Sequence, residues 1–307
     1  MQRPEQSRPG QSTPAHAEAE HAKAAGLAGR RILITRSADR ARPLAALLQH
    51  LGAEPLVLPL IDFERAADPA PLDAGLDRLA AGGFDWLVVS SVTTVQVLLA
   101  EAAERGVPLA ELVPAGTKVA TIGTSSRHVL ESVGLTVDLV PGDVQSADGL
   151  LKVWEKASSR VFLPQADIAA PGLREGLAAK GADVTAVVAY HTVDYPAREE
   201  ARLTAEVPAA VVNPGNGTLA VLNPDDVRKA FDAGTLDALV AASPSAARRL
   251  AAMFPTLGTC RFVAIGRPTA VEASRLGMTV GATAQEPTPD GIVAALQSVF
   301  ANEGNPQ

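Results

Sequence analysis

The sequence predicts a parallel α/β protein made of a duplicated unit, with two similar lobes and a cleft between them. Two observations support this fold class. From residue 31 onward, short apolar runs alternate with longer stretches of helical periodicity, as in β-α-β units around a parallel sheet. The chain also repeats its own pattern. With 307 residues, 47% of them hydrophobic, it is long enough for two domains and can bury a core in each.

The first predicted elements are a strand, a helix and a second strand. Residues 31–36 (RILITR) form an apolar run typical of a buried strand. Residues 38–51 follow with leucines on one helical face, and Gly52 is placed to end that helix. A second strand is predicted over 55–63. The same alternation of strand and helix continues to the end of the chain.

The internal repeat covers most of this pattern. KVATIGTSSRHVLESVG matches RFVAIGRPTAVEASRLG, and DWLVVSSVTTVQVLL matches DALVAASPSAARRLAAM. RRILITR likewise resembles SRVFLPQ. Self-similarity at this spacing indicates duplication of one supersecondary unit. The aligned pairs include Ser91 with Ser243, Gly123 with Gly266, and Gly149 with Gly291.

Two segments lie outside the repeat. Residues 1–29 are polar and rich in proline, which predicts a disordered tail without the apolar core of a signal peptide. Residues 196–223 are rich in turn-forming residues, which is consistent with a hairpin, with a loop over the cleft, or with a surface insertion that has no function.

Composition excludes several classes of function. The 27 Lys and Arg against 34 Asp and Glu give a net charge of −7, which disfavours nucleic acid as a partner. Cys260 is the single cysteine, so no internal disulfide forms, and the five histidines form no zinc motif. We therefore expect no metal site built on histidines or cysteines, whereas carboxylate sites stay open. No run of 18 apolar residues occurs, so we expect a cytoplasmic protein without a membrane span.

Candidate binding residues cluster where predicted strands lead into helices. Hydroxyl-bearing and small residues occupy 90–94, 123–126, 243–245 and 266–269. The unpaired N–H groups of helix N-termini suit phosphates or carboxylates, although Ser and Thr are also ordinary helix caps. The sequence has neither a dinucleotide-binding fingerprint nor a phosphate loop. Tyr190 could donate a proton at a strand end, and His191 could act as a base or be structural.

Together these segments resemble the uroporphyrinogen-III synthase family over residues 30–300. AVVAYHTV resembles its Tyr-x-Thr-Val strand, ALVAASPSAARRL its Thr-Ser-Pro-Ser segment, and AQEPTPDGIVAAL its Pro-Thr-Pro element. The chain departs from the family pattern at four places. Ser126 replaces a Thr and keeps the hydroxyl, and Thr93 replaces an Asn. One Thr of a Pro-Thr-Thr element is missing at Arg267-Pro268-Thr269, and 164–167 lack the Arg of a Pro-Arg-Gly-Asn loop.

The resemblance implies an exchange of one segment between lobes. It predicts two flavodoxin-like lobes with parallel sheets, joined by a two-stranded β bridge. Lobe 1 would comprise 30–60 and 194–302, and lobe 2 would comprise 63–190. The bridging strands would lie at about 58–64 and 187–193.

The resemblance also implies an activity. The family cyclises hydroxymethylbilane, a linear tetrapyrrole with eight carboxylates, to uroporphyrinogen III, with inversion of ring D, loss of water and no cofactor. Tyr190 would assist departure of the hydroxyl group. Hydroxymethylbilane synthase would act upstream, and neither nucleic acid nor membrane is an expected partner. The substrate-binding candidates are Arg36, Ser91, Thr93, Gly123, Ser126, Ser243, Ser245, Gly266 and Thr269.

Two alternatives remain open at this point. The departures from the family pattern are compatible with an inactive, two-lobed paralogue that binds a ligand or regulates. Two α/β lobes also suit a phosphate-utilising transferase, although no phosphate loop supports it. A monomer is expected. If the substrate is an octacarboxylate, its site in this acidic protein should be locally positive or lined with N–H donors.

Overall fold

The computed structural model describes residues 26–155, 158–203 and 219–301. The chain divides into two compact units, residues 1–60 with 215–307 and residues 61–214. Of the tail predicted over 1–29, residues 1–25 lie outside the described part. Residues 26–29 form a turn, and Leu27 is buried in the core of the first unit.

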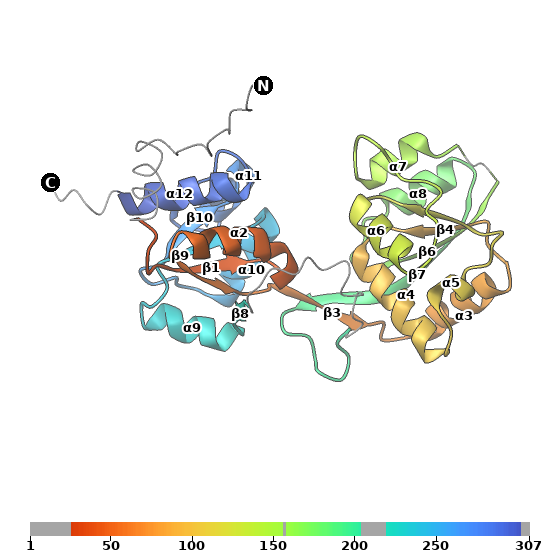
Figure 1. Ribbon diagram of the computed structural model, residues 1–307, viewed down its shortest axis with the longest axis horizontal. Helices are drawn as coiled ribbons and strands as arrows, with labels where there is room; N and C mark the ends of the chain where they lie inside the picture. The colour runs from red at the N-terminus through yellow and green to blue at the C-terminus, as the bar shows by residue number, and fades with distance from the viewer. Residues whose placement is uncertain (1–25, 156–157, 204–218, 302–307) are drawn as a thin grey trace, which may run out of the picture. The chain divides into compact units, whose positions relative to one another are not determined.

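Unit 1 is built on a parallel sheet in the order β11-β10-β9-β1-β2-β8 (Figure 1). Helices α2 and α12 pack together and share a core with alternate side chains of the central strands, such as Ile32, Ile34 and Val240. Helices α10 and α11 pack on one another. The strands are β1 (Arg31–Thr35), β2 (Glu54–Val57), β8 (Ala220–Val221), β9 (Ala238–Ala241), β10 (Arg261–Ala264) and β11 (Val280–Thr283). The helices are α2 (Ala38–His50), α9 (Pro224–Asp232), α10 (Pro244–Met253), α11 (Arg267–Arg275) and α12 (Pro289–Ala301).

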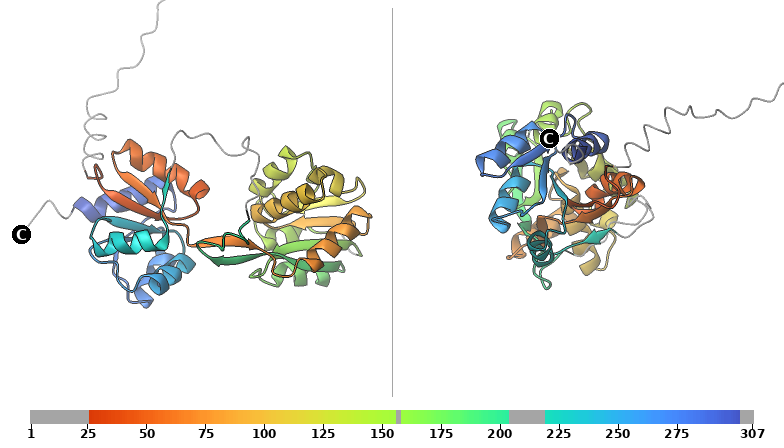
Figure 2. Two further views of the ribbon diagram at one scale, coloured as in Figure 1. Left: turned by 90° about the horizontal axis from the view of Figure 1, so that it is seen from below. Right: turned by 90° about the vertical axis from the view of Figure 1, so that its left-hand side faces the viewer.

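Unit 2 is built on a sheet in the order β3-β7-β6-β4-β5, in which only β3 is antiparallel. Helices α3 to α6 contribute to a core with Phe84 and Phe162, and α7 and α8 to a second core with Trp86 and Trp154 (Figures 1 and 2). The strands are β3 (Ile61–Arg65), β4 (Trp86–Val89), β5 (Lys118–Thr121), β6 (Arg160–Ala166) and β7 (Asp183–Asp194). The helices are α3 (Ala70–Ala80), α4 (Val92–Glu104), α5 (Leu109–Leu112), α6 (Thr124–Ser132), α7 (Ala147–Val153) and α8 (Gly172–Ala179).

The strand order confirms the prediction of two similar lobes. The repeat aligns β10, β9 and β1 with β5, β4 and β6, and the two sheets run β10-β9-β1-β2 and β5-β4-β6-β7. A parallel bridge from Ala120 to Leu139 corresponds to the pairing of β10 with β11. The order of β2, β1, β9, β10 and β11 is that of flavodoxin-like sheets. In unit 2 the same order is reached with a different chain connectivity.

The aligned glycines Gly149 and Gly291 explain part of the repeat. Both lie in the first turn of a helix, and each N–H donates a 3.1 Å hydrogen bond to a capping hydroxyl, of Ser146 and of Thr288. A Cβ on Gly149 would lie 1.8 Å from a backbone carbonyl oxygen, and one on Gly291 would lie 2.4 Å from another. Glycine is therefore required at both positions because the loop passes too close for a side chain.

The predicted strand over 55–63 is wrong, because two separate strands occupy this stretch. β2 pairs with β1 in unit 1, and the ladder ends where the Leu58 N–H donates to the Ile34 carbonyl. Pro59 follows and has no N–H to continue the ladder. The chain then enters β3, which pairs antiparallel with β7 from Ile61 opposite Asp194 to Arg65 opposite Tyr190.

The chain after β7 packs on β3. The Asp62 carboxylate accepts the Ala197 N–H at 3.0 Å and pairs with Arg202 at 3.0 Å. The Glu64 carboxylate accepts the Arg198 N–H at 2.8 Å and its guanidinium at 2.7 Å. These bonds hold residues 195–203 in unit 2, whereas the sequence-based division assigned them to lobe 1. Residues 204–218 of the predicted insertion lie outside the described part, and its end contributes β8.

Candidate functional site

Each sheet has a point at which successive chain connections run in opposite directions. In unit 1 this switch point lies between the neighbouring strands β1 and β9, and in unit 2 between β6 and β4. Ligands of open α/β sheets bind beyond the carboxyl ends of the strands at such points. These two sheet edges are therefore the expected ligand-binding positions of the two units.

The edge of unit 2 carries a cluster of hydroxyl groups. The Tyr190 hydroxyl of β7 lies 3.0 Å from the Ser91 Oγ, which follows β4. Ser91 caps α4 by accepting the Thr94 N–H at 3.0 Å, and its Oγ lies 2.9 Å from the Thr94 Oγ1. Tyr190 is 5% exposed, and its ring packs edge to face on Phe63 with the centroids 5.5 Å apart. The structure thus brings the predicted residues Tyr190 and Ser91 into direct contact.

A carboxylate and an imidazole form a second pair at this edge. The Asp167 Oδ2 lies 3.1 Å from the His191 Nδ1, and its Oδ1 accepts the Thr192 N–H at 2.9 Å. Burial acts to raise the pKa of Asp167, but the bonds from Thr192 and His191 outweigh it and the pKa is lowered. The carboxylate therefore stays ionised and orients the imidazole, with Nε2 directed away from this bond. Sequence considerations raised His191 as a base but did not pair it with Asp167.

The other candidates in unit 2 lie at helix starts. Thr93 is partly exposed in the first turn of α4. Gly123 caps α6, where the Gln145 Oε1 accepts the Thr124 N–H at 3.3 Å and its hydroxyl at 3.2 Å. Ser126 is buried under this helix start. Gln145, which the sequence did not single out, thus occupies donors at the α6 terminus.

The hydroxyl candidates of unit 1 are arranged in the same way. Ser243 caps α10 by accepting the Ala246 N–H at 3.1 Å, and its Oγ lies 3.0 Å from the exposed Ser245 Oγ. Gly266 precedes α11, and Thr269 is buried in the first turn of that helix. Ser243 and Ser245 therefore face the carboxyl edge together, whereas the Thr269 side chain lies within unit 1.

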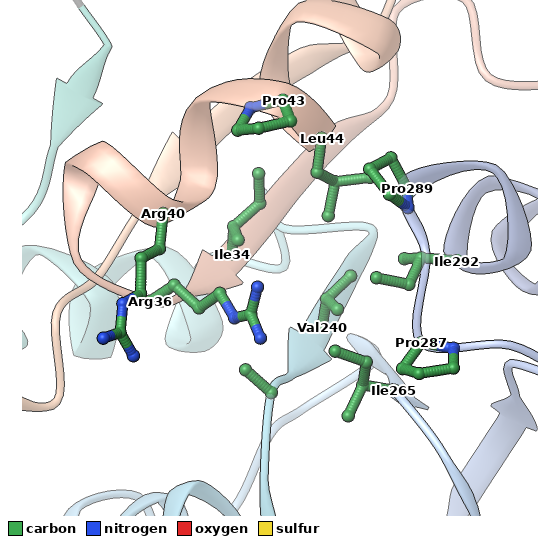
Figure 3. Close-up of a pocket in the computed structure, with 11 residues that line it drawn as sticks. Ile34, Arg36, Arg40, Pro43, Leu44, Val240, Ile265, Pro287, Pro289 and Ile292 are labelled. Carbon is green, nitrogen blue, oxygen red and sulfur yellow. The ribbon is translucent and has the colours of Figure 1, made fainter. Parts of the chain in front are cut away.

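A pocket of about 260 Å³ opens at the switch point of unit 1. Its walls are aliphatic side chains and prolines from β1, α2, β9 and the start of α12, and from the residues that follow β9 and β10 and precede α12 (Figure 3). Arg36, predicted from sequence, reaches across the pocket toward Val240, and Arg40, which the sequence analysis missed, lies at the rim with its guanidinium turned away from the aliphatic wall (Figure 3). The signal that could have identified Arg40 was its position in the first turn of α2, directly after the strand end that carries Arg36. The lining residues are Ile34, Arg36, Arg40, Pro43, Leu44, Val240, Ala242, Ile265, Pro287, Pro289 and Ile292.

The pocket is electrostatically positive. None of its lining residues is acidic, and neither Arg36 nor Arg40 makes a hydrogen bond or an ion pair within the described part of the chain. The pKa of Arg36 is lowered by burial and by the charge of Arg40, and Asp39 acts in the opposite sense. Two like charges held together without a partner favour an anionic ligand.

The described part of the chain, residues 26–155, 158–203 and 219–301, offers neither a metal-ligand cluster nor a membrane-spanning helix. These residues contain no group of three or more His, Cys, Asp or Glu side chains that could hold a metal ion. None of the described helices combines the length and the hydropathy that crossing a membrane requires.

The chain is similar to known proteins of tetrapyrrole biosynthesis. The family model for uroporphyrinogen-III synthase HemD matches residues 42–294. The porphyrin biosynthesis protein HemD of Ruminiclostridium josui is 29% identical over 115 residues, which are 38% of this chain but 22% of that protein. The chain therefore spans less than a quarter of the length of this relative.

A solved structure supports the fold. A mutant uroporphyrinogen III synthase from the extremely thermophilic bacterium Thermus thermophilus superposes with a TM-score of 0.53 and 18% identity, over 89% of this chain and 100% of that chain. Because the family model covers most of the chain, including Ser91 and Tyr190, the chain belongs to the uroporphyrinogen-III synthase family.

Proposed function

We propose that this protein is a uroporphyrinogen-III synthase, which cyclises hydroxymethylbilane to uroporphyrinogen III with inversion of ring D and loss of water. The observation that carries the proposal is the contact between Tyr190 and Ser91 at 3.0 Å, in a chain of this family and at the switch point of unit 2. A phenol beside a second hydroxyl can donate a proton to a departing oxygen.

The pyrrole nitrogens of the substrate supply the electrons for this reaction. Loss of the hydroxymethyl oxygen from ring A leaves an azafulvene, and the substituted carbon of ring D attacks it to form a spiro intermediate. The intermediate then fragments and recloses with ring D inverted. Tyr190 donates the proton with which the hydroxyl leaves as water, and the tyrosinate regains a proton as the closing macrocycle loses one. Ser91 holds the phenol in position and stabilises its anion.

The remaining candidates bind and fold the flexible substrate. Arg36 bears a positive charge at an apolar pocket, which suits a substrate that combines pyrrole rings with carboxylates. This local positive charge would let a substrate with eight carboxylates bind to a protein whose net charge is −7. We assign substrate contacts through side chains or N–H groups to Arg36, Ser91, Thr93, Gly123, Ser126, Ser243, Ser245, Gly266 and Thr269.

The proposal includes the place of the enzyme in the cell. Hydroxymethylbilane synthase would supply the substrate, and both enzymes would act in the cytoplasm, with this protein as a monomer. The pathway would be tetrapyrrole biosynthesis, which leads to haem-type and cobalamin-type products.

A coupled assay tests the activity. Hydroxymethylbilane is supplied to the full chain, the product is oxidised, and the type I and type III isomers are separated. Spontaneous closure gives type I, so an active synthase should shift the product to type III. Absence of type III enrichment would refute the activity. Tight substrate binding without turnover would favour the alternative of a binding or regulatory paralogue.

A further inference from the structure

The pocket of unit 1 is small relative to the proposed substrate. Its volume is about 260 Å³, below the ~300–1,000 Å³ typical of pockets that enclose a drug-sized ligand. It therefore cannot hold a linear tetrapyrrole, but its size suits one five-membered ring with its substituents. Its walls fit that shape, because Ile34, Val240 and Ile265 form an aliphatic surface and three prolines flank it (Figure 3).

The charges of the pocket match the same fragment. Eight carboxylates on four rings amount to two carboxylates per ring. Arg36 places one guanidinium group inside the pocket and Arg40 carries a second at its rim, from where the flexible side chain can turn inward; neither makes a hydrogen bond or an ion pair within the described part of the chain. Each planar guanidinium can bind a carboxylate through two parallel N–H bonds.

We propose that this pocket binds one pyrrole ring of the substrate, with the two carboxylates of that ring on Arg36 and Arg40. The ring lies against the aliphatic wall, and the two arginines fix its rotation, because both acid side chains must be held at once. The pocket thereby anchors one end of a flexible chain, which positions it for ring closure. The inference rests on the proposed function for the identity of the ring.

Binding of a single-ring probe tests the pocket without turnover. The probe is a monopyrrole with one acetate and one propionate group, titrated into the full chain by calorimetry at fixed ionic strength. The dimethyl ester of the same probe is the uncharged control, and inorganic phosphate is the competitor. We expect the diacid to bind saturably with one site, the diester to bind much more weakly, and phosphate to displace the diacid poorly.

Variants locate the site. Arg36→Gln and Arg40→Gln should each weaken binding of the diacid roughly 10- to 100-fold, as expected for loss of a charge-assisted contact. Arg36→Lys keeps the charge without the planar fork and should give an intermediate affinity. The matched control is Arg228→Gln, because Arg228 also lies in unit 1 but is exposed and paired with Asp225. Melting temperatures establish that each variant is folded.

Four results would overturn the proposal. The first is that the wild type does not bind the diacid at all, and the second is that the diester binds as tightly as the diacid. The third is that both Arg→Gln variants bind the diacid as tightly as the wild type, and the fourth is that phosphate competes with the diacid at an affinity equal to that of the diacid, which would indicate a general anion site. The isomer assay keeps the two proposals separate. If the wild type forms type III product but does not bind the monopyrrole, the pocket assignment fails alone. If the probe binds but no type III product forms, the synthase activity fails and the ring pocket stands.

Discussion

The substitution Tyr190→Phe isolates the phenolic hydroxyl from the packing of its ring. The phenylalanine keeps the edge-to-face contact with Phe63. Ser91 keeps its bonds to the Thr94 N–H at 3.0 Å and the Thr94 Oγ1 at 2.9 Å, so no buried group is left unpaired. Loss of one neutral hydrogen bond should cost about 0.5–1.5 kcal/mol of stability. For a domain of this size that is a drop in Tm of roughly 1–6 °C.

The expected loss of activity is larger than this loss of stability. General acid assistance contributes upward of ~10² in rate, and we expect kcat to fall by about that factor. A factor of 10² corresponds to about 2.7 kcal/mol in the barrier, more than one neutral hydrogen bond contributes to folding. Rate of type III formation and thermal unfolding are measured on the same preparation.

Tyr195→Phe is the matched control, because Tyr195 is the only other tyrosine of the chain and follows Tyr190 closely on the same segment. It should leave kcat within about two-fold of the wild type, well short of an effect expected from a proton donor. If Tyr190→Phe keeps near-wild-type turnover while folded, Tyr190 does not supply the proton. A loss shared equally by both variants would point to packing instead.

Three further predictions concern stability and reactivity. Gly149→Ala puts a Cβ 1.8 Å from a backbone carbonyl and should cost at least ~1–3 kcal/mol in denaturant unfolding. Gly116→Ala, where nothing lies within 4 Å, is the control, and equal effects would contradict the steric argument. The hydrogen bonds from Arg160 lower the pKa of Asp85 to about 2, so its stabilisation is complete above the unfolded pKa near ~4 and is lost as pH falls toward 2. Asp85→Asn should flatten the dependence of the free energy of unfolding on pH between pH 2 and about 4. An unchanged slope in this range would contradict the role of Asp85. Burial raises the pKa of the Cys260 thiol to about 12, so alkylation at neutral pH should be far slower in the native than in the unfolded protein. Comparable rates in the two states would show that the thiol is accessible.

Much of the fold follows from local pattern. The repeat predicts the shared strand order because aligned segments with the same periodicity form the same supersecondary units. The helix caps at Ser91 and Ser243 follow from residue type, since a hydroxyl before a helix accepts a first-turn N–H. The local pattern gave a wrong prediction over 55–63. One apolar run there supplies β2 and β3, which belong to different sheets, and only their pairing partners show where β2 ends and β3 begins.

The docking of residues 195–203 on β3 was also beyond the sequence. The bonds from Ala197 and Arg202 to Asp62, and from Arg198 to Glu64, join residues more than a hundred positions apart. Polar residues in such a segment are equally typical of a solvated loop. Whether such a segment docks or stays solvated depends on which carboxylates the neighbouring strand presents to it, and this is a property of the tertiary structure.

The sequence by itself determined the α/β class, the duplication, the family resemblance and the catalytic candidate Tyr190, because each is written in residue types and spacings along the chain. Only the tertiary structure decided which candidates meet. Tyr190 reaches Ser91 because β7, β6 and β4 are neighbours in one sheet, and His191 meets Asp167 for the same reason. The pocket of unit 1 emerged only once β1, α2, β9 and α12 converged, since a cavity is a property of several segments together and of none alone.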